Sequence, residues 1–158
     1  MSTCIIISWI TKLLYVYSVA ESPKITVIMR KAYGGSYLAM CSKDLGADMV
    51  LAWPTSEIAV MSAEGAANII FAKDIKAAKD NALAAGNDEA AARAASEAVR
   101  QEKIAEYTAQ FATPYVAASH GYVDCVIEPA ETREYILDAL ELFENKKREG
   151  RVRGNMPL

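Results

Sequence analysis

Two adjacent glycines, Gly34 and Gly35, stand between an apolar run and a segment that can wind as a helix, Tyr37–Met40. Glycine lets the backbone bend freely and lie close to a ligand. The free N–H groups at the start of a helix then point at whatever sits in the turn. When that is a carbonyl oxygen gaining negative charge, the turn is an oxyanion hole. Taken alone, the pair is more often an ordinary strand-to-helix turn.

The residues around this turn predict a layered α/β arrangement. Apolar and β-branched residues predict a buried strand over Lys24–Arg30, and shorter strands over Met49–Trp53 and Glu57–Met61. Helical spacing of apolar residues predicts a helix over Thr11–Glu21. Ser22-Pro23 ends that helix, because the residue before a proline avoids the helical region. Alternation of helix and strand favours α/β packing.

Helices are predicted for most of the middle of the chain. Ser62 is a candidate N-cap for a helix that includes Ala66–Ala72. The alanine-rich stretch Lys73–Arg100, interrupted at Gly86-Asn87-Asp88, indicates a helical hairpin or an extended helix with a turn. We interpret it as a solvated helical insertion rather than a partner surface. Gln101–Phe111 continues as helix.

The last part of the chain predicts two more helices with a short apolar segment between them. Thr113-Pro114 fits an N-cap followed by proline at the first helical position. Tyr122–Ile127 is a short apolar segment. A helix begins at Pro129 with an apolar face from Ile136, Leu137, Leu140 and Phe143. The basic tail from Lys146 is interpreted as a solvated terminus.

Composition limits the classes of protein. The chain has 158 residues, 53% of them hydrophobic and 23% charged, which fits one globular domain. A net charge of -3 provides no footprint for nucleic acid. Three widely spaced cysteines argue against a disulfide framework or zinc site and favour the cytoplasm, and no metal site is expected. The single histidine, His120, is interpreted as a helix-cap or surface residue rather than a base. Cys41 and Cys125 are expected to be small buried apolar residues.

The first ten residues, 1–10, do not match the pattern of the remainder. They are apolar without an obvious period. No Lys or Arg precedes the apolar run, and the run is too short to span a bilayer, so a signal or anchor is disfavoured. A buried strand or a non-native start is expected there, and residues 11–158 are expected to form the domain.

Four blocks of the sequence carry a resemblance to a known family. They are PKITVIMRKAYGGSYLAM, GADMVLAWPTSEIAVMSAEGAANIIF, TPYVAASHGYVDCVIEPAETREYI and the terminal RGNMPL. In this order, over roughly residues 12–158, they resemble the biotin-dependent acyl-CoA carboxyltransferase family. Its relevant members are the β subunits of propionyl-CoA and related acyl-CoA carboxylases. The α subunits of methylmalonyl-CoA and glutaconyl-CoA decarboxylases are similar. Only the later part of the family's C-terminal domain is matched.

The resemblance implies a crotonase-like fold of repeated ββα units and a site for biotin. In the family the Gly-Gly-small turn supplies backbone N–H groups to the biotin ureido oxygen. Carried over, these groups belong to Gly35 and Ser36, with Gly34 shaping the turn and Tyr33 beside the cofactor. Ser36 stands where alanine is more usual. Tyr33, Trp53, Pro54 and Glu57 are interpreted first as residues that pack and shape the pocket.

The resemblance also implies a reaction and partners. The family moves a carboxyl group between biotin, held on a separate carrier protein or domain, and an acyl-CoA such as propionyl-CoA. The ureido oxygen can take the proton from the acyl-CoA α-carbon, so the protein mainly fixes geometry and stabilises two oxyanions. Expected partners are acyl-CoA, biotin carboxyl carrier and biotin carboxylase subunits, and further copies of the chain or a missing N-terminal half.

The departures from the family pattern shape the remaining expectations. The N-terminal domain with its acyl-CoA oxyanion turn has no counterpart here, so we expect a truncated or split subunit with little activity alone. A decarboxylase α-subunit fragment and a non-catalytic crotonase-like remnant remain as alternatives. A ββα unit separated from its neighbours exposes apolar surface, so we expect a dimer, a larger oligomer or poor solubility.

Overall fold

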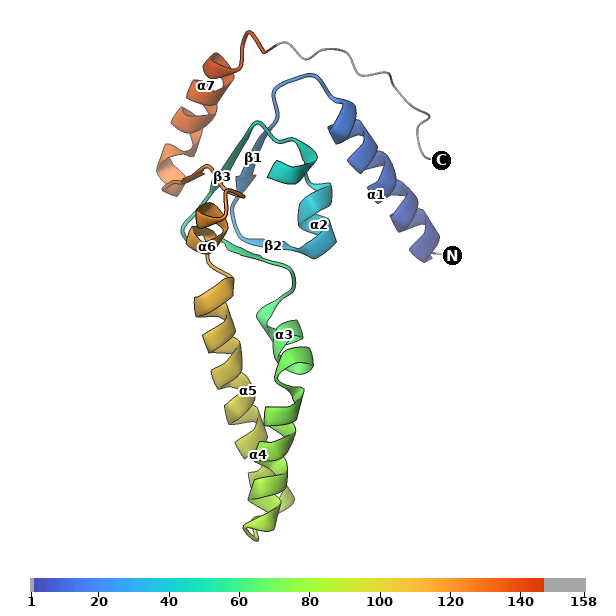
Figure 1. Cartoon of the computed structure of the whole chain (residues 1–158), viewed down its shortest axis with the longest axis vertical. Helices are drawn as coiled ribbons and strands as arrows, with labels where there is room; N and C mark the ends of the chain where they lie inside the picture. The colour runs from blue at the N-terminus through green and yellow to red at the C-terminus, as the bar shows by residue number, and fades with distance from the viewer. Residues whose placement is uncertain (1, 147–158) are drawn as a thin grey trace. The chain divides into compact units, whose positions relative to one another are not determined.

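The computed structural model describes residues 2–146, with side chains from residue 10 onward (Figure 1). The chain divides into two compact units. Of the described residues, 2–58 and 114–146 form the first, which we call the sheet unit. Residues 59–113 form the second, the hairpin unit. Each is described separately below.

A three-stranded parallel sheet forms the centre of the sheet unit. Its order is β1 (Ile25–Ile28), β3 (Met49–Ala52), β5 (Cys125–Val126). Strands were predicted at the places of β1 and β3, and β5 lies within the short apolar segment Tyr122–Ile127. In β3, Val50, Leu51 and Ala52 are completely buried. The central strand is therefore the most buried one, as both its edges and both its faces are covered.

The edge strand β1 differs from its prediction. A buried strand was expected over Lys24–Arg30, but Ile25, Thr26 and Val27 are only half-buried and only Ile28 is buried within the strand. The reason is topological, because β1 pairs with β3 on one side and with no described strand on the other.

Two ion pairs brace the amino ends of these strands. The Lys43 ammonium lies 2.6 Å from the Asp124 carboxylate, which also accepts a 2.8 Å hydrogen bond from the Val50 N–H. The Asp48 carboxylate accepts a 2.8 Å hydrogen bond from the Lys24 N–H and pairs with the Lys146 ammonium. Asp48 thus holds the chain just before β1, and Asp124 holds the start of β3, through hydrogen bonds to backbone N–H groups.

The helices of the sheet unit are α1 (Ser2–Val19), α2 (Gly34–Ala39), α6 (Pro114–Ser119) and α7 (Thr132–Leu142), with short 3-10 turns at Lys43–Leu45 and Pro129–Glu131. The strand expected within residues 1–10 is wrong, because α1 already begins at Ser2. No glycine or proline interrupts the chain before Pro23, so the helix predicted from Thr11 extends backward. Among the described residues, no helix has the length and apolar character needed to cross a membrane.

A second, two-stranded sheet joins β2 (Lys31–Tyr33) to β4 (Glu57–Ala59). The strand β4 lies within the one predicted over Glu57–Met61. The strand β2 was not predicted, since the sequence was interpreted as passing directly from the first strand into the glycine turn. This small sheet places the chain immediately before Gly34.

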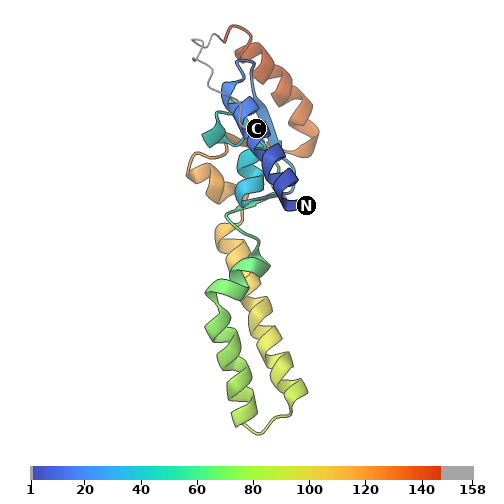
Figure 2. The same cartoon turned by 90° about the vertical axis from the view of Figure 1, so that its right-hand side faces the viewer.

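The hairpin unit contains α3 (Ala63–Ile70), α4 (Ala72–Ala84) and α5 (Glu89–Phe111), and Figure 2 shows α4 and α5 running side by side. The Ser62 hydroxyl accepts a 3.2 Å hydrogen bond from the Gly65 N–H, which confirms the predicted N-cap. Between α4 and α5, Gly86 has φ +83°, so the predicted interruption is a real turn.

Candidate functional site

The glycine turn predicted to do chemistry joins β2 to α2. Tyr33, the last residue of β2, is extended with φ -120° and ψ 133°. Gly34 has φ +52°, in the left-handed region that favours glycine, and begins α2. One residue thus turns the chain from strand into helix. The predicted helix over Tyr37–Met40 begins three residues early, at Gly34.

The backbone of this turn is open to solvent. Gly35 and Ser36 are exposed, and a Cβ atom built on Gly35 would meet nothing within 4 Å. The first N–H groups of a helix have no acceptor inside the helix. Among the described residues, no other segment of the chain provides an acceptor for the N–H of Gly35 or Ser36. Two backbone donors are therefore available to a ligand from successive residues.

A side-chain hydrogen bond fixes the residue in front of the turn. The Tyr33 hydroxyl donates to the carboxylate of Glu57, the first residue of β4. The Glu57 N–H in turn donates to the Arg30 carbonyl at 3.0 Å. Glu57 was read from the sequence as a packing residue, and the structure adds this specific partner. In the sequence, only the position of Glu57 at the start of a predicted strand pointed to this residue. Its hydrogen-bond partner Tyr33 lies 24 residues earlier in the chain, so the contact itself could not be predicted.

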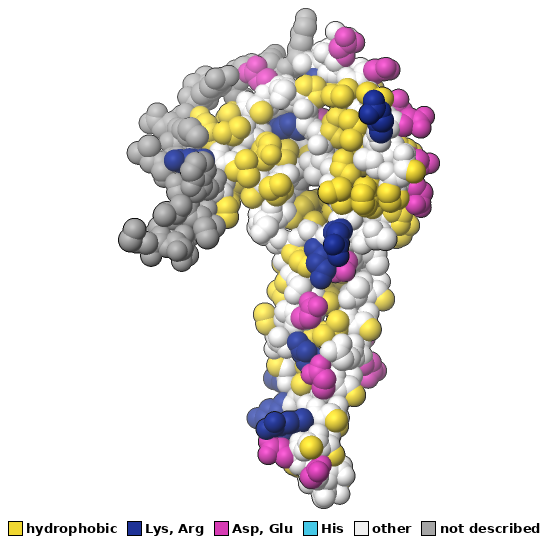
Figure 3. Space-filling view, turned by 180° about the vertical axis from the view of Figure 1, so that it is seen from behind, with side chains coloured by type: hydrophobic (Ala, Val, Ile, Leu, Met, Phe, Trp, Pro, Cys, Tyr) yellow, Lys and Arg dark blue, Asp and Glu magenta, His cyan; other side chains and the backbone are white. Residues whose placement is uncertain are grey.

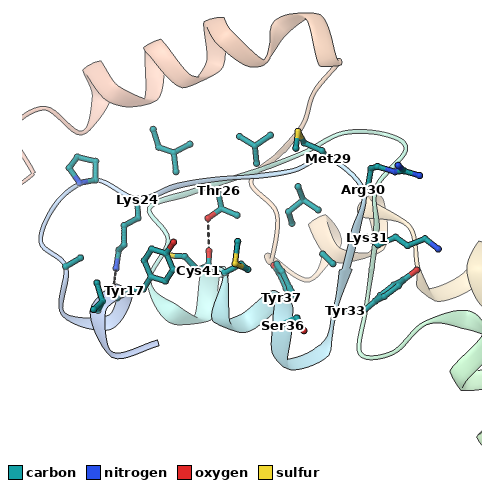
Figure 4. A pocket seen from close by; sticks show the side chains of 18 of the residues that line it. Tyr17, Lys24, Thr26, Met29, Arg30, Lys31, Tyr33, Ser36, Tyr37 and Cys41 are labelled. Carbon is teal, nitrogen blue, oxygen red and sulfur yellow. Dashed lines mark hydrogen bonds between the residues drawn. The ribbon is translucent and has the colours of Figure 1, made fainter. Parts of the chain in front are cut away.

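A pocket of about 860 Å³ lies beside the turn, along β1 and between α1 and α2 (Figure 4). Tyr33 and Ser36 line it, whereas Gly34 and Gly35 do not. Figure 4 shows Thr26 pointing toward α2, where its hydroxyl donates to the Cys41 carbonyl at 2.7 Å. The cations Lys24, Arg30 and Lys31 also line the pocket, and none of the described lining residues is acidic.

Tyr37 lines the same pocket from α2. Its hydroxyl is buried without a hydrogen-bond partner among the described residues. Burial, then the nearby Asp44 and Tyr122, raises the pKa of Tyr37 above its usual value. The phenol therefore stays protonated at neutral pH.

The other residues singled out in the sequence lie in ordinary structural environments. His120 is exposed just after α6, where its N–H donates to the Val116 carbonyl at 3.3 Å. Cys41 is buried, as expected, and has φ +70°, but Cys125 is only half-buried. The Trp53 indole N–H donates to the Thr132 hydroxyl at 2.9 Å, which agrees with a packing role. The basic tail was interpreted from the sequence as a solvated terminus. After Lys146 it lies outside the residues that the structure describes.

Comparison with known proteins gives a consistent family. A family profile described as "Carboxyl transferase domain" matches residues 5–156. The methylmalonyl-CoA carboxyltransferase 12S subunit of Propionibacterium freudenreichii subsp. shermanii is 56% identical over 148 residues, which are 92% of this chain and 25% of that subunit. The methylmalonyl-CoA decarboxylase subunit alpha of Propionigenium modestum is 53% identical over 93% of this chain and 26% of its own length.

Solved structures agree with these relatives. The crystal structure of transcarboxylase 12S with methylmalonyl-coenzyme A and methylmalonic acid bound matches 97% of this chain and 27% of that chain. Its TM-score is 0.80 and its sequence identity 55%. The beta subunit of P. aeruginosa geranyl-CoA carboxylase shares the fold, with a TM-score of 0.62 at 22% identity. The predicted α/β, crotonase-like carboxyltransferase fold is therefore confirmed.

The chain spans about a quarter of the length of the curated relatives that it matches. The match nevertheless extends over nearly all of this chain, includes the glycine turn, and preserves the fold. The chain belongs to the carboxyl transferase domain family.

Proposed function

We propose that this chain forms the biotin-binding part of a carboxyltransferase, which moves a carboxyl group between biotin and an acyl-CoA such as propionyl-CoA. The observation that carries the proposal is the 56% identity to the 12S subunit of a methylmalonyl-CoA carboxyltransferase, over a region that contains the open glycine turn. The acyl-CoA side of the site is assigned to another region of such a subunit.

The turn fits a planar cofactor that presents an oxygen atom. Gly35 and Ser36 are exposed residues that offer N–H donors from successive positions, and a Cβ atom at Gly35 would meet nothing within 4 Å. We assign these two N–H groups as the oxyanion hole for the biotin ureido oxygen. Gly34 shapes the turn through its left-handed backbone, and Tyr33 forms a side of the cofactor site. The Ser36 hydroxyl leaves these roles intact, because they use backbone atoms.

Biotin, when bound, supplies the carboxyl group and an oxygen that gains negative charge during transfer. The residues of this chain stabilise that charge and hold geometry rather than shuttle protons. Backbone N–H donors that are already oriented need no reorganisation when the charge develops, and removal of one such donor typically slows a reaction by about 100- to 1,000-fold. The Tyr33–Glu57 hydrogen bond also keeps these donors oriented, because it holds the residue that precedes the turn.

A decarboxylase α subunit is the second candidate. The α subunit of Propionigenium modestum methylmalonyl-CoA decarboxylase is 53% identical to this chain, close to the 56% of the 12S subunit. The residues of the glycine turn serve either direction of carboxyl movement equally. A non-catalytic remnant is the third reading, and it requires that the open turn bind nothing.

The proposed partners follow from the same assignment. They are an acyl-CoA, a biotin carboxyl carrier, a biotin carboxylase subunit, and either further copies of the chain or the remaining region of a carboxyltransferase subunit. The structure of the 12S relative is described as a hexamer and as part of a multienzyme core. We place the assembly in the cytoplasm on the cysteine pattern of the sequence.

A chimera tests the function directly. Residues 5–156 would replace the matching region of the Propionibacterium 12S subunit, and carboxyl exchange between methylmalonyl-CoA and biotin would be measured. We expect activity within about tenfold of the parent, which corresponds to about 1.4 kcal/mol of transition-state stabilisation. A folded chimera without exchange would refute the carboxyltransferase assignment. A parallel chimera on the Propionigenium modestum α subunit, assayed for decarboxylation, compares the two candidates.

A further inference from the structure

Two consecutive cations, Arg30 and Lys31, stand between β1 and the glycine turn. Lys31 begins β2, which pairs with β4, and the Arg30 carbonyl accepts a 3.0 Å hydrogen bond from the Glu57 N–H. The start of β4 therefore holds the main chain that carries both side chains. Both residues are exposed. The structure thus presents two adjacent positive charges on a fixed backbone.

The charged groups of Arg30 and Lys31 have no partner within the protein, unlike three other cations of the sheet unit. The Lys24 ammonium donates to a backbone carbonyl at 2.7 Å, and Lys43 and Lys146 form ion pairs with carboxylates. Among the described residues, no carboxylate lies within 4.0 Å of the Arg30 guanidinium or the Lys31 ammonium, and neither group donates a hydrogen bond. The pair is therefore available to an external anion.

The pair lies beside the residues assigned to biotin. Alternate residues of a strand share a face, so Lys31 and Tyr33 share one face of β2. Figure 4 shows the side chains of Arg30, Lys31 and Tyr33 on the same side of this strand. Ser36 lines the same pocket as these three residues, and none of the described lining residues is acidic. The Glu57 carboxylate accepts from the Tyr33 hydroxyl and is not part of that lining. An anion next to the turn would therefore meet two cations.

We infer that Arg30 and Lys31 bind an anionic oxygen group of the acyl-CoA as it meets biotin. Every acyl-CoA carries phosphate groups, and methylmalonyl-CoA also carries the carboxylate that is transferred. A guanidinium can match either group through two parallel N–H donors, and an ammonium binds it as a point charge. The inference rests on the proposed function, because it needs an acyl-CoA beside the biotin turn. It adds two residues of this chain to an acyl-CoA site that is otherwise assigned to another region.

The geometry of transfer brings the acyl-CoA to this place. The reacting atoms of the two substrates must approach to about 3–3.5 Å. The N–H groups of Gly35 and Ser36 hold one substrate, so the other must approach the same turn. At most about 14 Å of chain separates the Cα atoms of Lys31 and Gly35. A contact to a group that does not react is equally strong in the ground state and the transition state, so its loss raises KM and leaves kcat unchanged.

Steady-state kinetics of the 12S chimera test the inference. Arg30→Gln and Lys31→Gln each remove one charge, and a neutral biotin amide is the acceptor, so that the acyl-CoA is the only anionic substrate. We expect the KM for methylmalonyl-CoA to rise about tenfold in each variant, as for a lost charge-assisted hydrogen bond, with kcat within about twofold of the parent. Arg133→Gln removes an exposed charge in the first turn of α7 and should leave both constants unchanged.

Propionyl-CoA distinguishes the two sources of the anion, because it has the phosphates and lacks the transferred carboxylate. If the pair binds phosphate, the inhibition constant of propionyl-CoA should rise together with the KM for methylmalonyl-CoA. If the pair binds the carboxylate, only that KM should rise. Either result supports the inference, and an unchanged KM in both variants would overturn it. A rise confined to the KM for the biotin amide would overturn it as well, since the charges would then act on biotin.

Two further measurements separate this inference from the fold and from the proposed function. Arg30→Lys and Lys31→Arg keep the charge and should keep the KM within about threefold of the parent, whereas losses equal to those of the glutamine variants would overturn the charge assignment. Equilibrium dialysis with methylmalonyl-CoA, without biotin, needs no turnover. In a folded but inactive chimera, weaker binding by the glutamine variants would support the cation pair although the transfer function had failed. Equal binding by the parent and both glutamine variants would overturn the pair.

Discussion

Gly34 and Gly35 are neighbours with different physical roles. Gly34 is held at φ +52°, a conformation that costs an L-residue energy because its Cβ approaches the following carbonyl. Gly35 lies in the first turn of α2, where a Cβ has free space. The first glycine is required by the backbone, and the second by the ligand that we propose. Substitutions at the two positions should therefore separate stability from activity.

Gly34→Ala should lower the free energy of unfolding by about 1–2 kcal/mol, the cost of a left-handed L-residue. Gly35→Ala is the matched control. It should leave that free energy unchanged or raise it by about 0.5–1 kcal/mol, because alanine is the better helix former. Urea denaturation of the 158-residue chain measures both. Equal losses in the two variants would contradict the backbone assignment.

Tyr33→Phe should lower the free energy of unfolding by about 1–2 kcal/mol. It removes the hydroxyl that donates to Glu57 and leaves the carboxylate without this donor. Glu57→Gln is the control, since the amide oxygen can still accept the hydrogen bond, and its loss should be smaller. A Tyr33→Phe variant as stable as the parent would mean that β4 does not hold the turn.

At the scale of elements, the hairpin unit is held by helix ends and small buried residues. Ala66 and Ala67 of α3 and Ala92 of α5 are fully buried, and most other side chains of the unit are exposed. The Asp88 carboxylate accepts a 2.8 Å hydrogen bond from the Ala91 N–H and so caps α5. With so small a core, a cap accounts for a large share of the local stability.

Asp88→Ala should destabilise α5 by about 1 kcal/mol, because the first turn loses its side-chain acceptor. Hydrogen exchange of the first turn of α5 should speed up, while amides of β3 stay unchanged. Asp88→Asn keeps a capping oxygen and should behave like the parent. Faster exchange in β3 of the alanine variant would show that the two units do not unfold separately.

Sequence patterns predicted the elements that are specified locally. The strand β3 was found from an apolar run bounded by Gly46 and Pro54, and the turn between α4 and α5 from Gly86. The strand β2 was missed because it pairs with β4, about 25 residues away in the chain, and Lys31 carries a charge. The edge position of β1 was also missed. Burial depends on which strands lie beside it, and local composition does not report that.

The candidate site shows the same division between local and long-range information. The glycine turn was visible because conformation at Gly34 is set by residue type. The contact of Tyr33 with Glu57 and the pocket along β1 depend on contacts between segments that are far apart in the sequence. Family resemblance suggested the proposed role of the turn in binding biotin, and the residues alone indicated only an anion-binding shape.

At the scale of the whole molecule, apolar side chains reach the surface of the sheet unit. On α7, Leu137, Leu140 and Leu142 are 50%, 47% and 69% exposed, and the first two belong to the face predicted to pack. Figure 3 shows hydrophobic side chains gathered over one face of this unit. Along the hairpin unit, acidic and basic side chains are interspersed with exposed apolar ones such as Val60 and Ile69. The gathered leucines of α7 make the sheet unit a surface suited to association.

The isolated chain should associate as its concentration rises, through apolar surface on the sheet unit. Size-exclusion chromatography with light scattering over about a hundredfold range of concentration measures the mass. A double variant, Leu137→Lys with Leu140→Lys, should reduce association without loss of helix content. A monomer at all concentrations, with a sharp unfolding transition, would mean that the exposed leucines do not drive assembly.

The central claim is that the turn at Gly35 and Ser36 holds biotin through its backbone. The most direct measurement is the rate of carboxyl exchange in the 12S chimera carrying Gly35→Ala, with Gly65→Ala as control. Both changes add a Cβ to a helix, and at Gly65 it meets only the Ser62 hydroxyl at 3.4 Å. We predict a loss of about 100-fold or more for Gly35→Ala, comparable to losing an oxyanion-hole donor, and full activity for Gly65→Ala. Full activity in a Gly35→Ala chimera of normal stability would contradict the claim.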